Sequence, residues 1–208
     1  MGTSMAFYHI KNRGFDRQEL QEIMDQSVSP SNVRDTVFKS MFGEEWLRLY
    51  QSFLPQDRLE PKPPVLGYRP DASWLPFFDS GMCDGYNATS ADARRLSKIF
   101  GAPVIVFSIF DSDILMLSYS DAEKNIHYDY AQPNCEGYDT GHFQRELPLF
   151  LLFLCPGLTR ETLKELWEGE EVFADDRMEK LCEALRMFPI YQADSIPEGF
   201  EAIRADQT

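Results

Sequence analysis

The chain has 208 residues and a formal net charge of −14, and 43% of its residues are hydrophobic. This length and composition allow a large domain with a proper core and exclude a wholly disordered chain. No apolar run approaches the roughly 20 residues that a membrane-spanning helix needs, and no basic-then-apolar signal peptide opens the chain, so neither a membrane protein nor a secreted one is expected.

The negative charge lies almost entirely in the second half of the chain. Residues 1–100 carry 12 basic and 13 acidic side chains, whereas residues 101–208 carry 8 basic and 21 acidic ones. This acidic half argues against nucleic-acid binding, which needs a basic footprint. It suits a solvated surface, or a basic protein partner that is attracted by electrostatic steering.

The first quarter is predicted to be mostly helical after a short strand at residues 6–11. Asp16 is a good N-cap for a helix that runs to about Ser27. Two further helices are expected, one that Gly43 ends and one over residues 46–53.

Prolines then dominate the chain as far as residue 76. Because proline removes amide donors and fixes φ, the segment 59–76 is predicted to be an extended connector. It is too aromatic for a free linker, and a strand is expected at residues 74–78. The predicted organisation is a helical N-terminal region at 1–58 and an α+β domain at 59–208, together forming one compact unit.

A helix followed by three strands with tight turns decides the predicted fold class. Thr89 or Ser90 is expected to cap the helix, and Gly101 suits its C-terminal end. With helices before and after the strands, this order predicts an α+β fold in which an antiparallel β-meander packs against helices.

The three strands of the meander are predicted at residues 104–110, 114–120 and 126–130. The near-continuous apolarity of the first indicates a central strand that is buried on both faces. In the third, His127 and Asp129 alternate with apolar residues, which is typical of a half-exposed outer strand.

The rest of the chain is predicted to be mainly helical. A buried helix is expected at residues 147–154, and two more begin at Thr159 and at Asp175. A short final strand is expected at residues 190–191.

No catalytic residue, metal ligand or cofactor is assigned from the sequence. The three histidines form no HxH or HExxH motif, and no glycine-rich phosphate-binding motif occurs. Asp111, Ser112 and Asp113 fit a tight turn between two strands better than a calcium loop, which needs a central glycine and a late glutamate.

The four cysteines are scattered, and no CxxC pair occurs. Without a secretion signal, this pattern predicts reduced thiols in a cytoplasmic protein. Cys135 lies between His127 and His142 in the sequence, so a hydrolase or small-molecule site at the Cys135/His142 loop stays an alternative.

Three segments carry a resemblance to known proteins: SADARRLSKIFGAPVIVFSIFDSDILMLSYSD, the later IHYDY, and FADDRMEKLCEAL. From about Trp74 onward the chain resembles an uncharacterised family of bacterial proteins, whose most recognisable piece is the Asp-Ser-Asp hairpin between two strands. It is also similar to the SUKH-type immunity proteins. That resemblance implies an α+β binding module that neutralises a toxin, and it transfers no catalytic residue.

The sequence therefore favours a non-enzymatic interaction module, such as a toxin-neutralising immunity protein with a basic partner, over an enzyme or an oligomerisation unit. No nucleic acid or membrane is expected among its partners. The predicted contact residues lie on the outer strand and in the acidic stretch that follows the meander: His127, Asp129, Tyr130, Glu168, Glu170, Glu171, Asp175 and Asp176.

Overall fold

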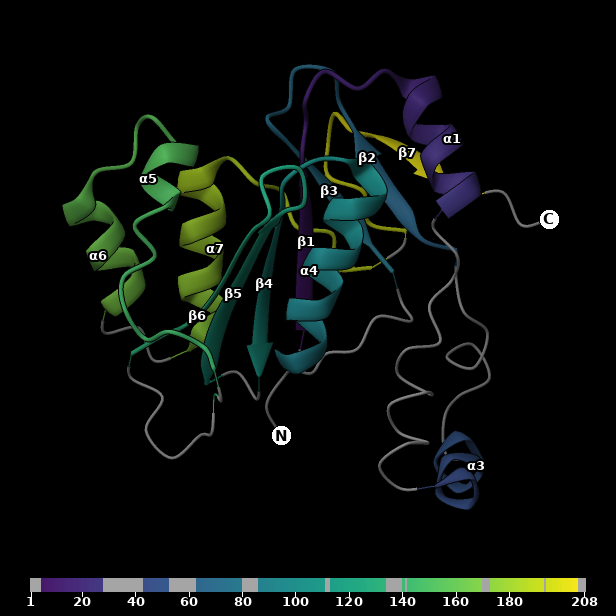
Figure 1. The fold of residues 1–208 in the computed structure, drawn as a ribbon, viewed down its shortest axis with the longest axis horizontal. Coiled ribbons are helices and arrows are strands. Elements are labelled where there is room, and N and C mark those ends of the chain that lie inside the picture. The colour runs from purple at the N-terminus through teal and green to yellow at the C-terminus, as the bar shows by residue number, and fades with distance from the viewer. Residues whose placement is uncertain are drawn as a thin grey trace.

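The computed structural model describes residues 5–27, 43–52, 63–79, 86–110, 113–133, 140, 142–169, 173–192 and 194–205. These residues build a seven-stranded sheet with helices on both faces (Figure 1), and every strand pairing in it is antiparallel. The predicted α+β class is confirmed.

The sheet has the strand order β6-β5-β4-β1-β3-β2-β7. The strands are β1 (Met5–Lys11), β2 (Val65–Tyr68), β3 (Trp74–Phe78), β4 (Val104–Phe110), β5 (Ile114–Asp121), β6 (Ile126–Ala131) and β7 (Glu201–Arg204). The helices are α1 (Arg17–Ser27), α3 (Glu44–Ser52), α4 (Tyr86–Phe100), α5 (Leu151–Leu154), α6 (Arg160–Glu168) and α7 (Ala174–Leu185).

The predicted meander is confirmed as β4, β5 and β6. The apolar strand β4 lies between β1 and β5, as its two buried faces require, and β6 forms one edge of the sheet. Strand β1 pairs with both β3 and β4, so the N-terminal strand lies inside the same sheet as the meander. The boundary between 1–58 and 59–208 falls outside the described residues.

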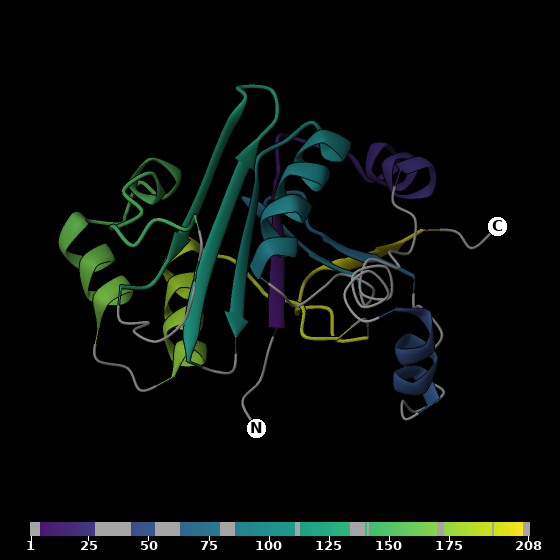
Figure 2. The same ribbon diagram turned by 60° about the horizontal axis from the view of Figure 1, so that its bottom comes forward.

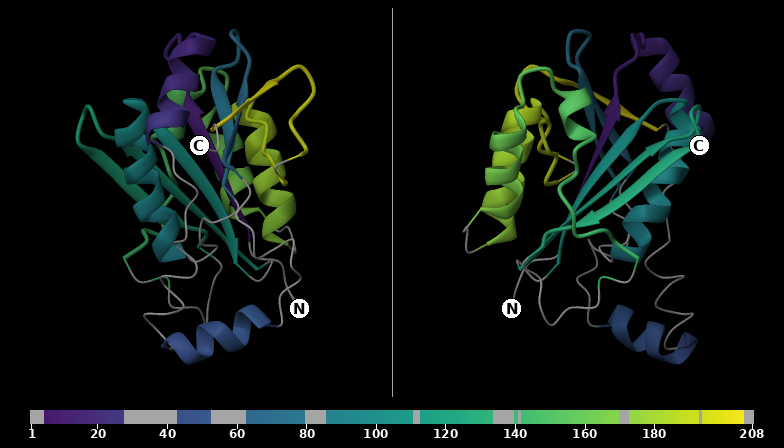
Figure 3. Two further views of the ribbon diagram at one scale, coloured as in Figure 1. Left: turned by 90° about the vertical axis from the view of Figure 1, so that its right-hand side faces the viewer. Right: turned by 60° about the vertical axis from the view of Figure 1, so that its left-hand side comes forward.

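Two hydrophobic layers cover the two faces of the sheet. On one face α1 and α4 pack against it, with Leu20, Met24, Leu96 and Phe100 buried. On the other face α7 packs against β4 and β5, and α6 packs against α7; the buried side chains of these two helices are Leu163, Trp167, Met178, Leu181 and Leu185. Figures 2 and 3 show α4 and α7 on opposite sides of the strands.

The helix α3 lies apart from both layers. Its Trp46 is 62% exposed and its Leu49 is 46% exposed, so this pair does not enter the described core. All three ribbon views show α3 away from the sheet. The helix predicted before Gly43 lies outside the described residues.

Local signals placed several helix ends correctly. The Asp16 carboxylate accepts a hydrogen bond from the Glu19 backbone at 2.8 Å, and Thr159 caps α6 in the same way through the Thr162 amide at 3.1 Å. Gly101 follows α4 with a positive φ of 54°, as expected of a residue that ends a helix.

Three predictions about element boundaries were wrong. Helix α4 begins at Tyr86, so Thr89 and Ser90 are buried inside it rather than capping it. Helix α5 covers only Leu151–Leu154, because the residues before it form turns, in which the Leu151 amide donates to the Pro148 carbonyl at 3.0 Å. The final strand is β7, paired with β2, and not residues 190–191.

Candidate functional site

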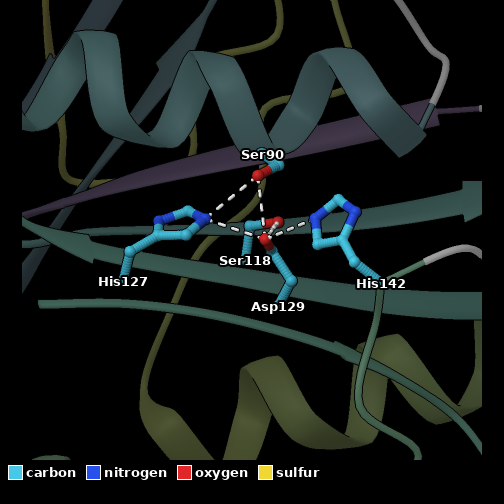
Figure 4. A network of polar contacts seen from close by, with 5 residues as sticks. All are labelled: Ser90, Ser118, His127, Asp129 and His142. Carbon is cyan, nitrogen blue, oxygen red and sulfur yellow. Dashed lines mark hydrogen bonds and ion pairs between the residues drawn. The ribbon is translucent and has the colours of Figure 1, made fainter.

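A polar network lies between α4 and the edge of the sheet. The register of β5 and β6 pairs Ser118 with Asp129 and Ser120 with His127. Because side chains alternate along a strand, His127 and Asp129 share the face that α4 covers. Ser90 reaches the same place from α4, and His142 reaches it from the chain after β6 (Figure 4).

Asp129 is the centre of this network. Its Oδ2 atom accepts hydrogen bonds from Ser90 Oγ at 2.9 Å, from His127 Nε2 at 2.8 Å and from His142 Nε2 at 2.9 Å. Its Oδ1 atom accepts one from Ser118 Oγ at 2.7 Å. The carboxylate is therefore buried but fully hydrogen-bonded, as a buried charge must be.

These contacts keep Asp129 ionised. Burial alone would raise the pKa of the carboxyl, but hydrogen bonds from His127, Ser118 and Ser90, together with the charge of His127, lower the pKa to about 2. The site is thus a fixed negative charge near the edge of the sheet.

The carboxylate also determines where the imidazole protons lie. An ionised carboxylate only accepts hydrogen bonds, so Nε2 of His127 and Nε2 of His142 must each carry a proton. The Nδ1 atom of His127 is buried without a hydrogen-bond partner among the described residues. The side chain of His142, in contrast, is 58% exposed.

This geometry differs from that of a Ser-His-Asp catalytic triad. In a triad the serine and the aspartate contact different nitrogens of one imidazole. Here Ser90 and Asp129 both contact Nε2 of His127, and Ser90 is only 5% exposed. Within the described part of the chain, no group of three or more His, Cys, Asp or Glu side chains could hold a metal ion.

The structure places the predicted strand residues on two different faces. His127 and Asp129 meet in the network, but Tyr130 lies on the other face, with its ring centroid 5.7 Å from that of Phe150. The prediction that the edge around Asp129 is exposed was wrong: Asp129 is 5% exposed because α4 covers it.

Sequence reasoning missed Ser90 and Ser118 as members of the network. The available signal was the pairing of two polar alternations, Ser118-x-Ser120 and His127-x-Asp129, on neighbouring strands. Such a pairing predicts a polar patch on one face of the sheet. His142 was singled out only as a neighbour of Cys135, which lies outside the described residues.

Three of the predicted acidic residues belong to α6 and α7, on the opposite face of the sheet from the network. Glu168 is exposed at the end of α6, and Asp175 and Asp176 lie in the first turn of α7, where they complement the helix dipole. Glu170 and Glu171 lie outside the described residues. No described helix is long and apolar enough to cross a membrane.

A second buried carboxyl belongs to Asp92 of α4, whose Oδ2 atom accepts a hydrogen bond from Tyr8 Oη at 3.3 Å. Burial raises its pKa to about 6, and the nearby Asp79 adds to this shift while Arg95 and Tyr8 oppose it. The folded state thus binds the Asp92 proton more tightly than the unfolded state does, so the stability from this group is lost as the pH rises through 6.

Replacing Asp92 with asparagine is therefore expected to raise the free energy of unfolding at pH 8 by about 1–2 kcal/mol, less than the full pKa shift would give because Arg95 loses its partner. At pH 4 the gain should vanish. Denaturant unfolding at both pH values measures the difference. An equal loss of stability at pH 4 and pH 8 would contradict the expectation.

No protein-family model, curated protein or solved structure matches this chain. The resemblance to a bacterial family and to SUKH-type immunity proteins therefore stays a prediction.

Proposed function

We propose that this chain is a non-enzymatic, cytoplasmic protein-binding module of bacterial origin that neutralises a basic toxin, as immunity proteins do. The observation that carries the proposal is the exposed Phe173 within the acidic stretch 168–176. Its side chain is 52% exposed at the start of α7.

The composition of this stretch suits a basic partner. Residues 168–176 contain five carboxylates and no basic side chain. The next cation along the chain, Arg177, is buried and directs its guanidinium inward, to Gln132 Oε1 at 2.8 Å and to the Gly169 carbonyl at 2.7 Å. An exposed aromatic ring among carboxylates provides an apolar anchor with a charged rim, and the charge would steer a basic protein towards it.

The test uses the protein encoded by the gene adjacent to the gene for this chain. Expression of that neighbouring protein in a bacterial host should stop growth, and co-expression of this chain should restore growth. Phe173→Ser is expected to weaken binding of the purified toxin by about tenfold, because truncating an aromatic residue at the centre of an interface costs about 1–2 kcal/mol of binding free energy.

A matched control is available on α5. Phe153 is even more exposed, at 87%, but lies outside the acidic stretch, so Phe153→Ser should leave toxin binding unchanged. Toxicity that co-expression does not relieve would overturn the proposal. If both phenylalanine variants lost the same affinity for the toxin, the acidic stretch would not be the binding site.

A second candidate function is a hydrolase or small-molecule-binding protein that uses the Cys135/His142 loop. It is favoured by the Asp129–His142 hydrogen bond, because a catalytic base needs an orienting group. A thiolate activated by His142 should react with iodoacetamide at pH 6.5 much faster than a free cysteine does. Reaction of Cys135 at the rate of free cysteine, unchanged in His142→Phe, would exclude this candidate.

A further inference from the structure

His142 presents an imidazole that is exposed but held in place. The described chain around it is tied to β6, since the Gln144 amide donates to the Asp129 carbonyl at 2.9 Å and the Ala131 amide donates to the Gln144 carbonyl at 2.8 Å. The neighbouring Phe143 is buried in a cluster with Ile114 and Met116. A fixed surface group loses little conformational freedom when it binds a ligand.

Asp129 determines what this imidazole offers to a ligand. Because Nε2 of His142 donates to the carboxylate, the neutral ring carries its lone pair on Nδ1. Figure 4 shows the second ring nitrogen on the side of the ring away from Asp129. The side of the ring away from Asp129 is therefore a hydrogen-bond acceptor of fixed direction.

We infer that Nδ1 of His142 is a binding site for a basic side chain, an arginine or lysine of a partner protein that donates an N–H group to it. A cationic ligand is favoured over an anionic one because the surrounding charge is negative. The ionised Asp129 is hydrogen-bonded to the other nitrogen of the ring, and the chain carries a net charge of −14. The nearest cation along the chain, Arg145, donates to the Thr140 hydroxyl at 3.3 Å.

This site is distinct from the acidic stretch of the proposed function. His142 contacts the network on the α4 face of the sheet, whereas Phe173 lies at the start of α7, which packs on the other face. The two sites can therefore be tested with separate variants.

The test uses the full chain and hexa-arginine amide as the probe, with ¹⁵N NMR of the histidine rings at pH 8, where exposed imidazoles are neutral. Before peptide is added, the His142 spectrum should show the proton on Nε2. The peptide should shift the Nδ1 resonance, and His142→Phe should bind it about three- to tenfold more weakly, which is the net effect of one typical hydrogen bond.

Gln144→Ala is the matched control, since Gln144 is exposed beside His142 and only its backbone holds the strand. It should bind hexa-arginine as the unchanged chain does, and hexa-glutamate should bind to neither. A proton on Nδ1, or equal affinity of His142→Phe and the unchanged chain, would overturn the inference. Toxin neutralisation that depends on Phe173 would be unaffected by that outcome.

Discussion

Replacing Asp129 with alanine is expected to lower the free energy of unfolding by about 3–5 kcal/mol, the usual cost of breaking a buried charged network. The substitution removes the acceptor of four hydrogen bonds at once. Ser90, Ser118 and His127 have little access to water and would be left without that acceptor. Urea unfolding at pH 7 measures the loss.

Asp176→Ala is the matched control, because Asp176 is exposed in the first turn of α7 and supports only the helix dipole. It is expected to cost about 0.3–1 kcal/mol. If Asp129→Ala costs no more than this control, the network does not stabilise the fold.

The pH dependence of stability provides an independent check on Asp129. Its pKa falls from 3.8 to about 2 on folding, so the folded state binds this proton less tightly than the unfolded state does. The stabilisation is complete above pH 4 and is lost as the pH falls towards 2, an amount of about 2 kcal/mol. The difference between the unchanged chain and Asp129→Ala should shrink by that amount between pH 4 and pH 2.

Short-range signals in the sequence were sufficient for much of the fold. The Asp16 cap, the apolar run of β4 and the alternation in β6 each depend on neighbouring residues, and each gave the right element. The prediction of the final strand was wrong because β7 depends on a partner that is distant in sequence. Its four residues show no strong pattern of their own, and they form a strand because β2, far away in sequence, offers them a free edge.

The candidate site depends on the same distinction between local and long-range effects. The alternation of His127 and Asp129 shows that they share a face, but it cannot show that α4 will cover that face. Nor does anything in the local sequence separate a serine that caps a helix from one inside it. Ser90 lies inside α4, where its hydroxyl donates to Asp129 on the adjacent face of the sheet instead of capping the amides of its own helix.

The serines of the network are not placed as the nucleophile of a catalytic triad is. Both serines donate to the carboxylate and neither is accessible, so the hydroxyls stabilise the anion rather than attack a substrate. Among the five residues of the network, His142 is the most exposed, with 58% of its side chain accessible to solvent. An oriented acceptor on a negatively charged molecule is suited to recognition of a cation.

Replacing His9 with leucine is expected to make the protein more acid-resistant. His9 is completely buried on β1, its ring packs edge-on against Phe107, and neither ring nitrogen has a hydrogen-bond partner among the described residues. Burial lowers its pKa from 6.5 to about 3; the nearby Phe188 backbone opposes the shift but forms no hydrogen bond with the ring. The folded state therefore holds a neutral imidazole in its core.

The sign of the pH effect follows from proton binding. Between pH 6.5 and pH 3 the unfolded chain binds a proton at His9 that the folded chain does not, so the free energy of unfolding falls as the pH falls. At pH 4.5 this loss amounts to about 2–3 kcal/mol, and His9→Leu removes it. The gain of the variant over the unchanged chain should therefore grow by that amount between pH 7 and pH 4.5 in denaturant unfolding.

The comparison of the two pH values separates titration from packing. Leucine differs from histidine in shape, but any cost or gain from that difference is the same at both pH values. All other groups titrate equally in the two proteins, so only the protonation of His9 can change the stability difference between pH 7 and pH 4.5. A stability difference that stays constant from pH 7 to pH 4.5 would mean that the folded protein accommodates a charged His9, through water or through movement of the chain around Phe188.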